Sequence, residues 1–190
     1  MPTQHPFVAT PVAVPELAAA LTAAWRAELG SDPSRAALLV LLAQWSLETG
    51  GGAKCIQWNL GNAKSIAGDG YDWTEFPTTE VVNGAVVHMT ARFRAFPSLA
   101  DGAADYLKLL TRRFAKAWPF VVAGDVDGFA RALHEAHYYT APVEDYARGM
   151  LARASAIARA WPPEQAALPS VVVAADDQPI FVAPSPEDDA

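Results

Sequence analysis

The chain is poor in the residues that build disulfides, metal sites and membrane spans. Cys55 is its only cysteine, so an intrachain disulfide is impossible. No group of cysteines and histidines has the spacing of metal ligands, and His134 and His137, three residues apart, are typical of an ordinary pair near a helix end. No apolar run reaches about 18 residues without a polar break, which argues against a membrane span. We therefore expect no metal, no other cofactor and no transmembrane helix.

Positive charge is also scarce. The 190 residues include 14 lysines and arginines against 21 aspartates and glutamates, which gives a net charge of −7. Residues 162–190 hold six of the acidic residues and none of the basic ones, so the rest of the chain has 14 basic and 15 acidic residues. Because a nucleic-acid-binding protein needs a basic face, we expect no nucleic acid partner. The nearly neutral body suits an uncharged or mixed-charge polymer.

The length and the hydrophobic content of 52% fit one domain with a core of ordinary size. Prolines punctuate residues 1–14, which we expect to be a flexible leader, and the domain itself to span residues 15–161. Proline, aspartate and alanine dominate residues 162–190, which predicts a disordered acidic tail. Within that tail, the run Val171–Val173 could alternatively form an edge strand.

The chain does contain helical patterns and one hairpin. Asn83-Gly84 stands between two β-branched runs, which predicts a two-residue turn joining strands over residues 74–82 and 85–96. In the second strand, alternation places Phe93 on the face opposite its arginine neighbours. The predicted fold class is mainly α with a small β lobe. Capping residues, apolar spacing and glycine or proline stops predict helices at residues 15–30, 35–48, 98–118, 125–135 and 144–161.

Glu48 is the last residue of the most apolar of these helices. Glycines 50–52 stop the helix, because glycine enters the left-handed conformation of a C-cap without a Cβ penalty. The negative end of the helix dipole and the apolar neighbours Trp45 and Leu47 disfavour a charged carboxylate, so we expect a raised pKa for Glu48. A protonated acid at neutral pH is what general acid catalysis requires. The alternative is a glutamate that reaches solvent just past a core helix.

A second carboxylate, Glu80, lies in the first strand of the predicted hairpin. Such a residue is most often a solvated cross-strand partner, here of Arg92 or Arg94. Two carboxylates that face each other across a groove are also what cleavage of a glycosidic bond requires. One protonates the leaving oxygen, and the other guides water or stabilises positive charge on the sugar. Both interpretations of Glu80 remain open.

Three motifs in the right order resemble glycoside hydrolase family 73, the peptidoglycan N-acetylglucosaminidases that include flagellar and phage-associated types. The first runs from Glu48-Thr49 and the glycine-rich loop to Asn59–Lys64. The second is the hairpin with the following helix, from Thr79 to Tyr106, and the third is the segment Ala132–Ala147. The resemblance extends over roughly residues 36–157.

The resemblance implies a lysozyme-like α domain in which a small β-hairpin lobe forms one wall of a groove. By motif, Glu48 corresponds to the general acid and Glu80 to the second carboxylate. Tyr138 corresponds to the family's active-site tyrosine, with Tyr139 as the candidate if the register shifts by one. Without the resemblance, both tyrosines would be interpreted as packing at a helix end. Asn59 is expected to organise the loop near the acid, and contact with substrate is also open to it.

Two tryptophans are candidates for stacking on sugar faces. Trp58 and Trp73 offer apolar area to axial C–H groups, although packing in the core is the somewhat favoured interpretation of either ring. Three departures from the family pattern bear on substrate fit. Gly61-Asn62-Ala63 replaces Phe-Gly-Ile in the loop, Ala141 replaces an aspartate, and the interval from Pro142 to the next tyrosine is longer.

The predicted function is hydrolysis of β-1,4 bonds next to N-acetylglucosamine in peptidoglycan. The alternatives are a lytic transglycosylase, which uses one glutamate as acid and then base, and a non-catalytic wall-binding module of a phage or secretion apparatus. The N-terminus lacks the basic and apolar regions of a secretory signal, so we expect synthesis in the cytoplasm. Action in the periplasm or cell wall would then follow release or injection, with residues 162–190 as a possible docking segment for the delivering machine.

Overall fold

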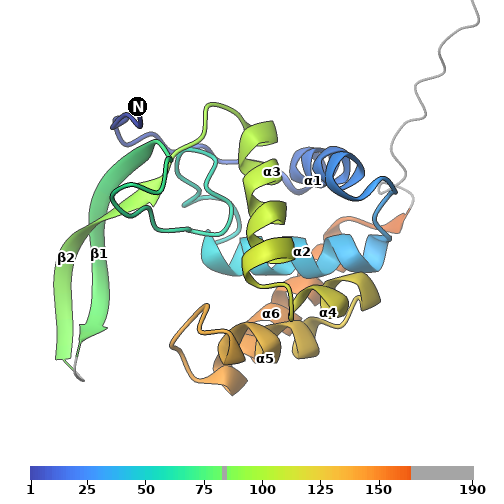
Figure 1. The fold of residues 1–190 in the computed structure, drawn as a ribbon. Helices are drawn as coiled ribbons and strands as arrows, with labels where there is room; N and C mark the ends of the chain where they lie inside the picture. The colour runs from blue at the N-terminus through green and yellow to red at the C-terminus, as the bar shows by residue number, and fades with distance from the viewer. Residues whose placement is uncertain (83–84, 164–190) are drawn as a thin grey trace, which may run out of the picture.

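The computed structural model describes residues 1–82 and 85–163, which form a mainly helical domain with one two-stranded antiparallel sheet, as the sequence predicted. Figure 1 shows the hairpin projecting from one side of the helical body. The elements in chain order are α1 (Val14–Leu29), α2 (Arg35–Glu48), β1 (Trp73–Val82), β2 (Ala85–Arg94), α3 (Leu99–Lys108), the π-helical segment η1 (Leu109–Arg113), α4 (Trp118–Ala123), α5 (Val126–Glu135) and α6 (Val143–Ala160).

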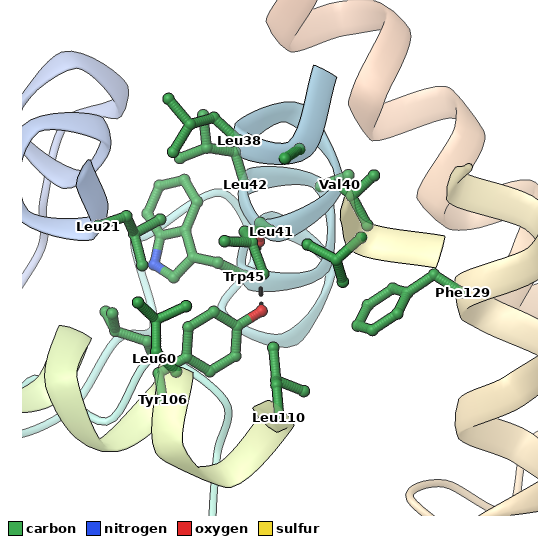
Figure 2. Close-up of a cluster of buried hydrophobic side chains, with 14 of the residues drawn as sticks. Leu21, Leu38, Val40, Leu41, Leu42, Trp45, Leu60, Tyr106, Leu110 and Phe129 are labelled. Atoms are coloured by element: carbon green, nitrogen blue, oxygen red, sulfur yellow. Dashed lines mark hydrogen bonds between the residues drawn. The ribbon is translucent and has the colours of Figure 1, made fainter. Parts of the chain in front are cut away.

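The helix α2 is the centre of the core. The side chain of Ser34 caps its first turn by accepting a hydrogen bond from the amide of Ala37. Beyond that turn the helix is mostly apolar, with Gln44 and Ser46 as buried polar residues, and it packs against α1, α4, α5 and α6. Figure 2 shows Trp45 of α2 between Leu21 and Leu60. A helix that is enclosed in this way fixes the position of whatever side chain stands at its end.

The hairpin has two chemically different faces, as the alternation in β2 predicted. Phe93 is buried and stacks on Phe76 of β1, with ring centroids 4.0 Å apart. On the opposite face, Arg92 pairs with Glu75 at 2.9 Å, and Arg94 pairs with a carboxylate of α3. In the strand register Arg92 lies opposite Glu75 and Arg94 opposite Trp73, whereas Glu80 lies opposite Val87, so neither arginine is the cross-strand neighbour of Glu80.

Two helical features near the end of α3 differ from the prediction. The Trp118-Pro119 pair, interpreted as a helix stop, begins the separate helix α4, because proline is well tolerated in a first helical turn. The second feature is η1, where five residues adopt π-helical geometry instead of continuing α3. Its apolar residues continue the stripe of α3, so the periodicity did not reveal the change.

Residues 1–14, expected to be a flexible leader, lie against the domain. Their backbone pairs with the start of β1: the amide of Trp73 donates to the carbonyl of Thr3 at 3.1 Å, and the amide of His5 donates to the carbonyl of Trp73 at 2.8 Å. The predicted turn at 83–84 and almost all of the predicted tail at 162–190 lie outside the described residues.

None of the described helices combines the length and apolarity that crossing a bilayer requires. Over residues 1–82 and 85–163, no three acidic, histidine or cysteine side chains gather as ligands for a metal ion.

Candidate active site

A groove of about 560 Å³ opens where four segments of the chain meet. Glu48 at the end of α2 lies in it, and the loop that follows α2 contributes residues 61–64. The remaining walls come from Arg94 at the end of β2, from η1 with Phe114, and from residues 137–140 before α6. The resemblance implied a groove beside the hairpin lobe, and the structure places Glu48 in one.

The end of α2 is shaped by glycine, as predicted. Glycines 50, 51 and 52 have φ angles of 60°, 74° and 92°. At position 52 a Cβ would also lie within 2.6 Å of the Trp45 ring and 2.8 Å of the carbonyl of Val12. Only glycine satisfies both the left-handed backbone and the close approach. The chain therefore turns sharply past Glu48 and leaves the carboxyl group facing the groove.

Two opposing influences act on the Glu48 carboxyl group. Burial among the surrounding side chains raises its pKa and is the larger influence. The hydroxyl of Tyr146 donates a hydrogen bond to Oε1 at 2.7 Å, which favours the charged form and partly offsets the rise. In the part of the chain that the structure describes, no arginine pairs with Glu48. The net result is a raised pKa, as the sequence predicted.

Tyr146 is a candidate functional residue that sequence reasoning missed. It stands in the first turn of α6, and its ring stacks on Tyr139 with centroids 3.7 Å apart and an angle of 11° between the planes. The stack and the hydrogen bond together hold the phenol against Glu48. The only signal for it was the Tyr146-Ala147 pair at the end of the third family motif, which carried no role of its own.

Asn59 organises the loop beside the acid, as expected. Its side-chain amide donates to the carbonyls of Ala63 at 2.9 Å and Arg94 at 3.0 Å, and its oxygen accepts from the amide of Ala63 at 2.8 Å. Asn59 is buried, and these hydrogen bonds engage its side chain with the protein backbone. Further along, Asn62 donates to the main-chain carbonyl of Glu48 at 2.6 Å. The loop is thus tied to both the hairpin and the end of α2.

Tyr138 and Tyr139 both line the groove. The Tyr138 hydroxyl donates to the carbonyl of Gly61 at 2.7 Å, and burial raises its pKa well above the ordinary value. The Tyr139 hydroxyl donates to the carbonyl of Ala130 at 2.9 Å. Both hydroxyls are therefore bonded to backbone carbonyls of the protein.

The two tryptophans lie elsewhere. Trp58 packs against the hydrophobic core, and Trp73 is covered by the guanidinium group of Arg92 at 4.6 Å from the ring centroid. Neither is among the residues that line the groove. Stacking of a sugar on Trp58 or Trp73 would therefore take place outside it.

Glu80 is placed only by its backbone. It belongs to β1 and pairs with Val87 of β2, toward the turn end of the hairpin. Its side chain lies outside the described part of the structure. The role of Glu80 as the second carboxylate stays a prediction.

Comparison with known proteins identifies the family. A family model described as mannosyl-glycoprotein endo-beta-N-acetylglucosaminidase, named Glucosaminidase, matches residues 30–158. The peptidoglycan hydrolase FlgJ of Escherichia coli (strain K12) is 34% identical over 131 residues, which cover 64% of this chain and 40% of FlgJ. The chain thus spans about two fifths of the length of the curated relatives it matches.

Solved structures agree with this assignment. A peptidoglycan hydrolase mutant from Sphingomonas sp. A1 matches with a TM-score of 0.54 and 32% identity, over 73% of this chain and 88% of that one. A truncated glycoside hydrolase domain of Salmonella typhimurium FlgJ matches with a TM-score of 0.52 and 28% identity, over 77% and 98%. Because the family model covers more than half of the chain, the protein belongs to the glucosaminidase family, glycoside hydrolase family 73.

Proposed function

We propose that this chain hydrolyses β-1,4 glycosidic bonds next to N-acetylglucosamine in peptidoglycan, with Glu48 as the general acid. The observation that carries the proposal is a partly buried carboxyl group with a raised pKa at the wall of a groove. A raised pKa lets a carboxyl group keep its proton to higher pH and transfer it to the oxygen of a leaving sugar. The curated relatives are peptidoglycan hydrolases, which supports this substrate.

The hydrogen bond from Tyr146 to Oε1 explains how the acid is oriented. A phenol that donates to Oε1 leaves Oε2 as the oxygen on which the acidic proton resides. The proton is then held at one defined atom of Glu48 and can be presented to the glycosidic oxygen. As the bond to the leaving sugar breaks, positive charge develops on the remaining ring, and Glu48 becomes a carboxylate.

The second step of hydrolysis has two candidate agents. One is Glu80, which would stabilise the positive charge or position the attacking water. The other is the acetamido oxygen of the substrate itself. A Glu80→Gln variant that retains full turnover would eliminate Glu80 and favour assistance by the substrate.

The acid is tested by digesting purified sacculi with a Glu48→Gln variant. We expect the release of muropeptides to fall by about 10²- to 10⁴-fold, the usual contribution of a general acid. Glu16→Gln, which changes an exposed glutamate in the first turn of α1, is the matched control and should retain activity. Undiminished activity of the Glu48→Gln protein would refute the assignment.

The same digest separates hydrolysis from transglycosylation. Asp69, the other described carboxylate in the groove, accepts hydrogen bonds from Ser65, Ile66 and Tyr71 and is held in its own loop. A single available acid is what a transglycosylase uses, so this route needs a direct test. Mass spectrometry of the products decides, because a hydrolysed reducing end is heavier by one water than a 1,6-anhydro end.

A wall-binding module without catalysis is the remaining alternative, since Gly61-Asn62-Ala63 and Ala141 depart from the family pattern. It would bind sacculi without releasing muropeptides.

For delivery, we propose synthesis in the cytoplasm and action at the wall after release by a phage or secretion machine, with residues 162–190 as the docking segment. Deletion of those residues without loss of delivery would contradict the docking role.

A further inference from the structure

The π-helical segment η1 forms one wall of the groove. Leu109 and Arg113 from this segment line the groove, together with Phe114 directly after it. A π turn adds a residue to a helical turn and changes the direction in which the following side chains point, and such turns are frequent at functional sites. Here the segment brings a guanidinium group to the wall of the groove.

Two successive arginines of η1 have different surroundings. Arg112 pairs with Glu28 of α1 at 2.9 Å, away from the groove. Arg113 is exposed, and its guanidinium carbon lies 5.4 Å from the centroid of the Phe114 ring. Among the side chains that the structure describes, no carboxylate forms an ion pair with Arg113. Its charge is therefore available to a ligand.

Two other charged groups that line the groove, Arg94 and Glu48, differ from Arg113 in how they are held. Arg94 is bound by both carboxylate oxygens of Asp105, at 3.0 and 3.2 Å, and lies over the Tyr71 ring. Burial raises the pKa of Glu48, which disfavours the carboxylate form that would compete for Arg113. A planar guanidinium group binds a carboxylate through two parallel hydrogen bonds, which suits it to this ligand better than to a neutral sugar.

We propose that Arg113 binds a carboxylate carried by the muramic acid units of the glycan, and thereby favours peptidoglycan over neutral N-acetylglucosamine polymers. The inference rests on the proposed function. The carboxylate has two sources: the peptide stem, or the lactyl group that is left free when the stem is absent. The edge contact of Phe114 with Tyr138, with ring centroids 4.9 Å apart, connects the Arg113 site with the tyrosine beside Glu48.

The test compares three soluble ligands: stem-bearing glycan strands, the same strands after an amidase has removed the stems, and neutral chitooligosaccharides. We expect Arg113→Gln to lower kcat/KM by about 5- to 10-fold on the strands that carry the recognised carboxylate, mostly through KM, because one charge-assisted contact is lost. Values for chitooligosaccharides should not change. A loss confined to stem-bearing strands assigns a carboxylate of the stem, and a loss confined to stripped strands assigns the lactyl carboxylate. A loss on both means that Arg113 accepts either one.

Arg112→Gln is the matched control and should match the wild-type protein on all three ligands. Arg113→Lys keeps the charge but not the planar fork, so it should recover part of the affinity. Unchanged kcat/KM of Arg113→Gln on both stem-bearing and stripped strands, or an equal loss on chitooligosaccharides, would overturn the proposal. If the wild-type protein cleaves none of the ligands, the proposed function fails, and direct binding of the three ligands to wild-type and Arg113→Gln proteins still decides the role of Arg113.

Discussion

At the scale of single residues, the Glu48 carboxyl group owes its state to a balance between burial and one phenol. Burial disfavours the carboxylate, whereas the hydrogen bond from Tyr146 favours it. The same phenol is stacked on Tyr139, which restricts its movement. Tyr146 is therefore a positioning residue, because it acts on the substrate only through Glu48.

Replacement of Tyr146 by phenylalanine removes the bond and leaves most of the stacking area. The pKa of Glu48 should rise, because the influence that lowers it is lost, and the basic limb of the kcat/KM profile should shift to higher pH. We also expect kcat to fall by roughly 5- to 10-fold, the equivalent of one hydrogen bond. The measurement is the pH dependence of soluble-glycan cleavage. A uniform fall in rate without a shift of the basic limb would indicate a purely structural role.

The sequence was informative about residues whose environment is local. The raised pKa of Glu48 followed from a helix end and apolar neighbours, both of which are visible in the chain. The contact with Tyr146 joins residues 98 positions apart, and periodicity says nothing about such a pair. Trp58 and Trp73 were ambiguous for the same reason, because an aromatic ring fits a core and a sugar site equally well.

At the scale of elements, the contact between α3 and the loop after α2 determines where the groove lies. A Cβ at Gly102 of α3 would come within 2.1 Å of the carbonyl oxygen of Trp58, so helix and loop backbones touch. Because the neighbour is backbone, it cannot rotate away as a flexible side chain would. Asn59, the residue after Trp58, is hydrogen-bonded through its side chain to the backbone of Ala63. The position of this part of the loop therefore depends on the contact with α3.

The substitution Gly102→Ala should therefore damage both stability and activity. We expect a loss of about 2–4 kcal/mol in the free energy of unfolding, because the loop must move to admit the methyl group. Gly30→Ala is a useful comparison: its Cβ would meet nothing within 4 Å, and only its φ of 73° is unfavourable, which should cost about 1 kcal/mol. Chemical denaturation measures the free energy of unfolding of the two variants. Equal losses in the two variants would contradict the close packing of α3 on the loop.

The predictions of secondary structure were confirmed where the signal lay within the element itself. Ser98 caps α3 through the amide of Asp101, and the apolar run of 35–48 became α2. The failures at α4 and η1 have different physical causes. Proline both stops a helix and starts one, and a π turn needs only one residue more than an α turn. The outcome at both places depends on how the following segment packs, which local sequence does not encode.

At the scale of the whole molecule, the raised pKa of Glu48 makes stability depend on pH. The folded state binds this proton more tightly than the unfolded state, in which the pKa is near 4.5, so protonation stabilises the fold. That contribution is fully present below pH 4.5 and is lost as the pH rises through the higher pKa of the folded state. A glutamine at position 48 mimics the protonated acid and avoids the loss.

Glu48→Gln should accordingly be more stable than the wild-type protein at pH 8, and the difference should shrink toward pH 4. Thermal unfolding of both proteins across this range is the measurement. Glu16→Gln, at an exposed site, should show no comparable trend. A difference that grows as the pH falls would mean that Glu48 is held as a carboxylate, and it would remove the basis for a general acid.

The solitary thiol of Cys55 offers a way to observe how often the loop beside the acid opens. Its sulfur is fully enclosed, between the hydroxyl of Thr10 at 3.7 Å and the carbonyl of Asn59 at 3.9 Å, and burial raises the pKa of the thiol. An alkylating reagent can reach it only during a transient opening of this segment. Because the chain has one sulfhydryl, its rate of labelling reports how often this segment opens. Ligands that stabilise the closed segment should lower that rate.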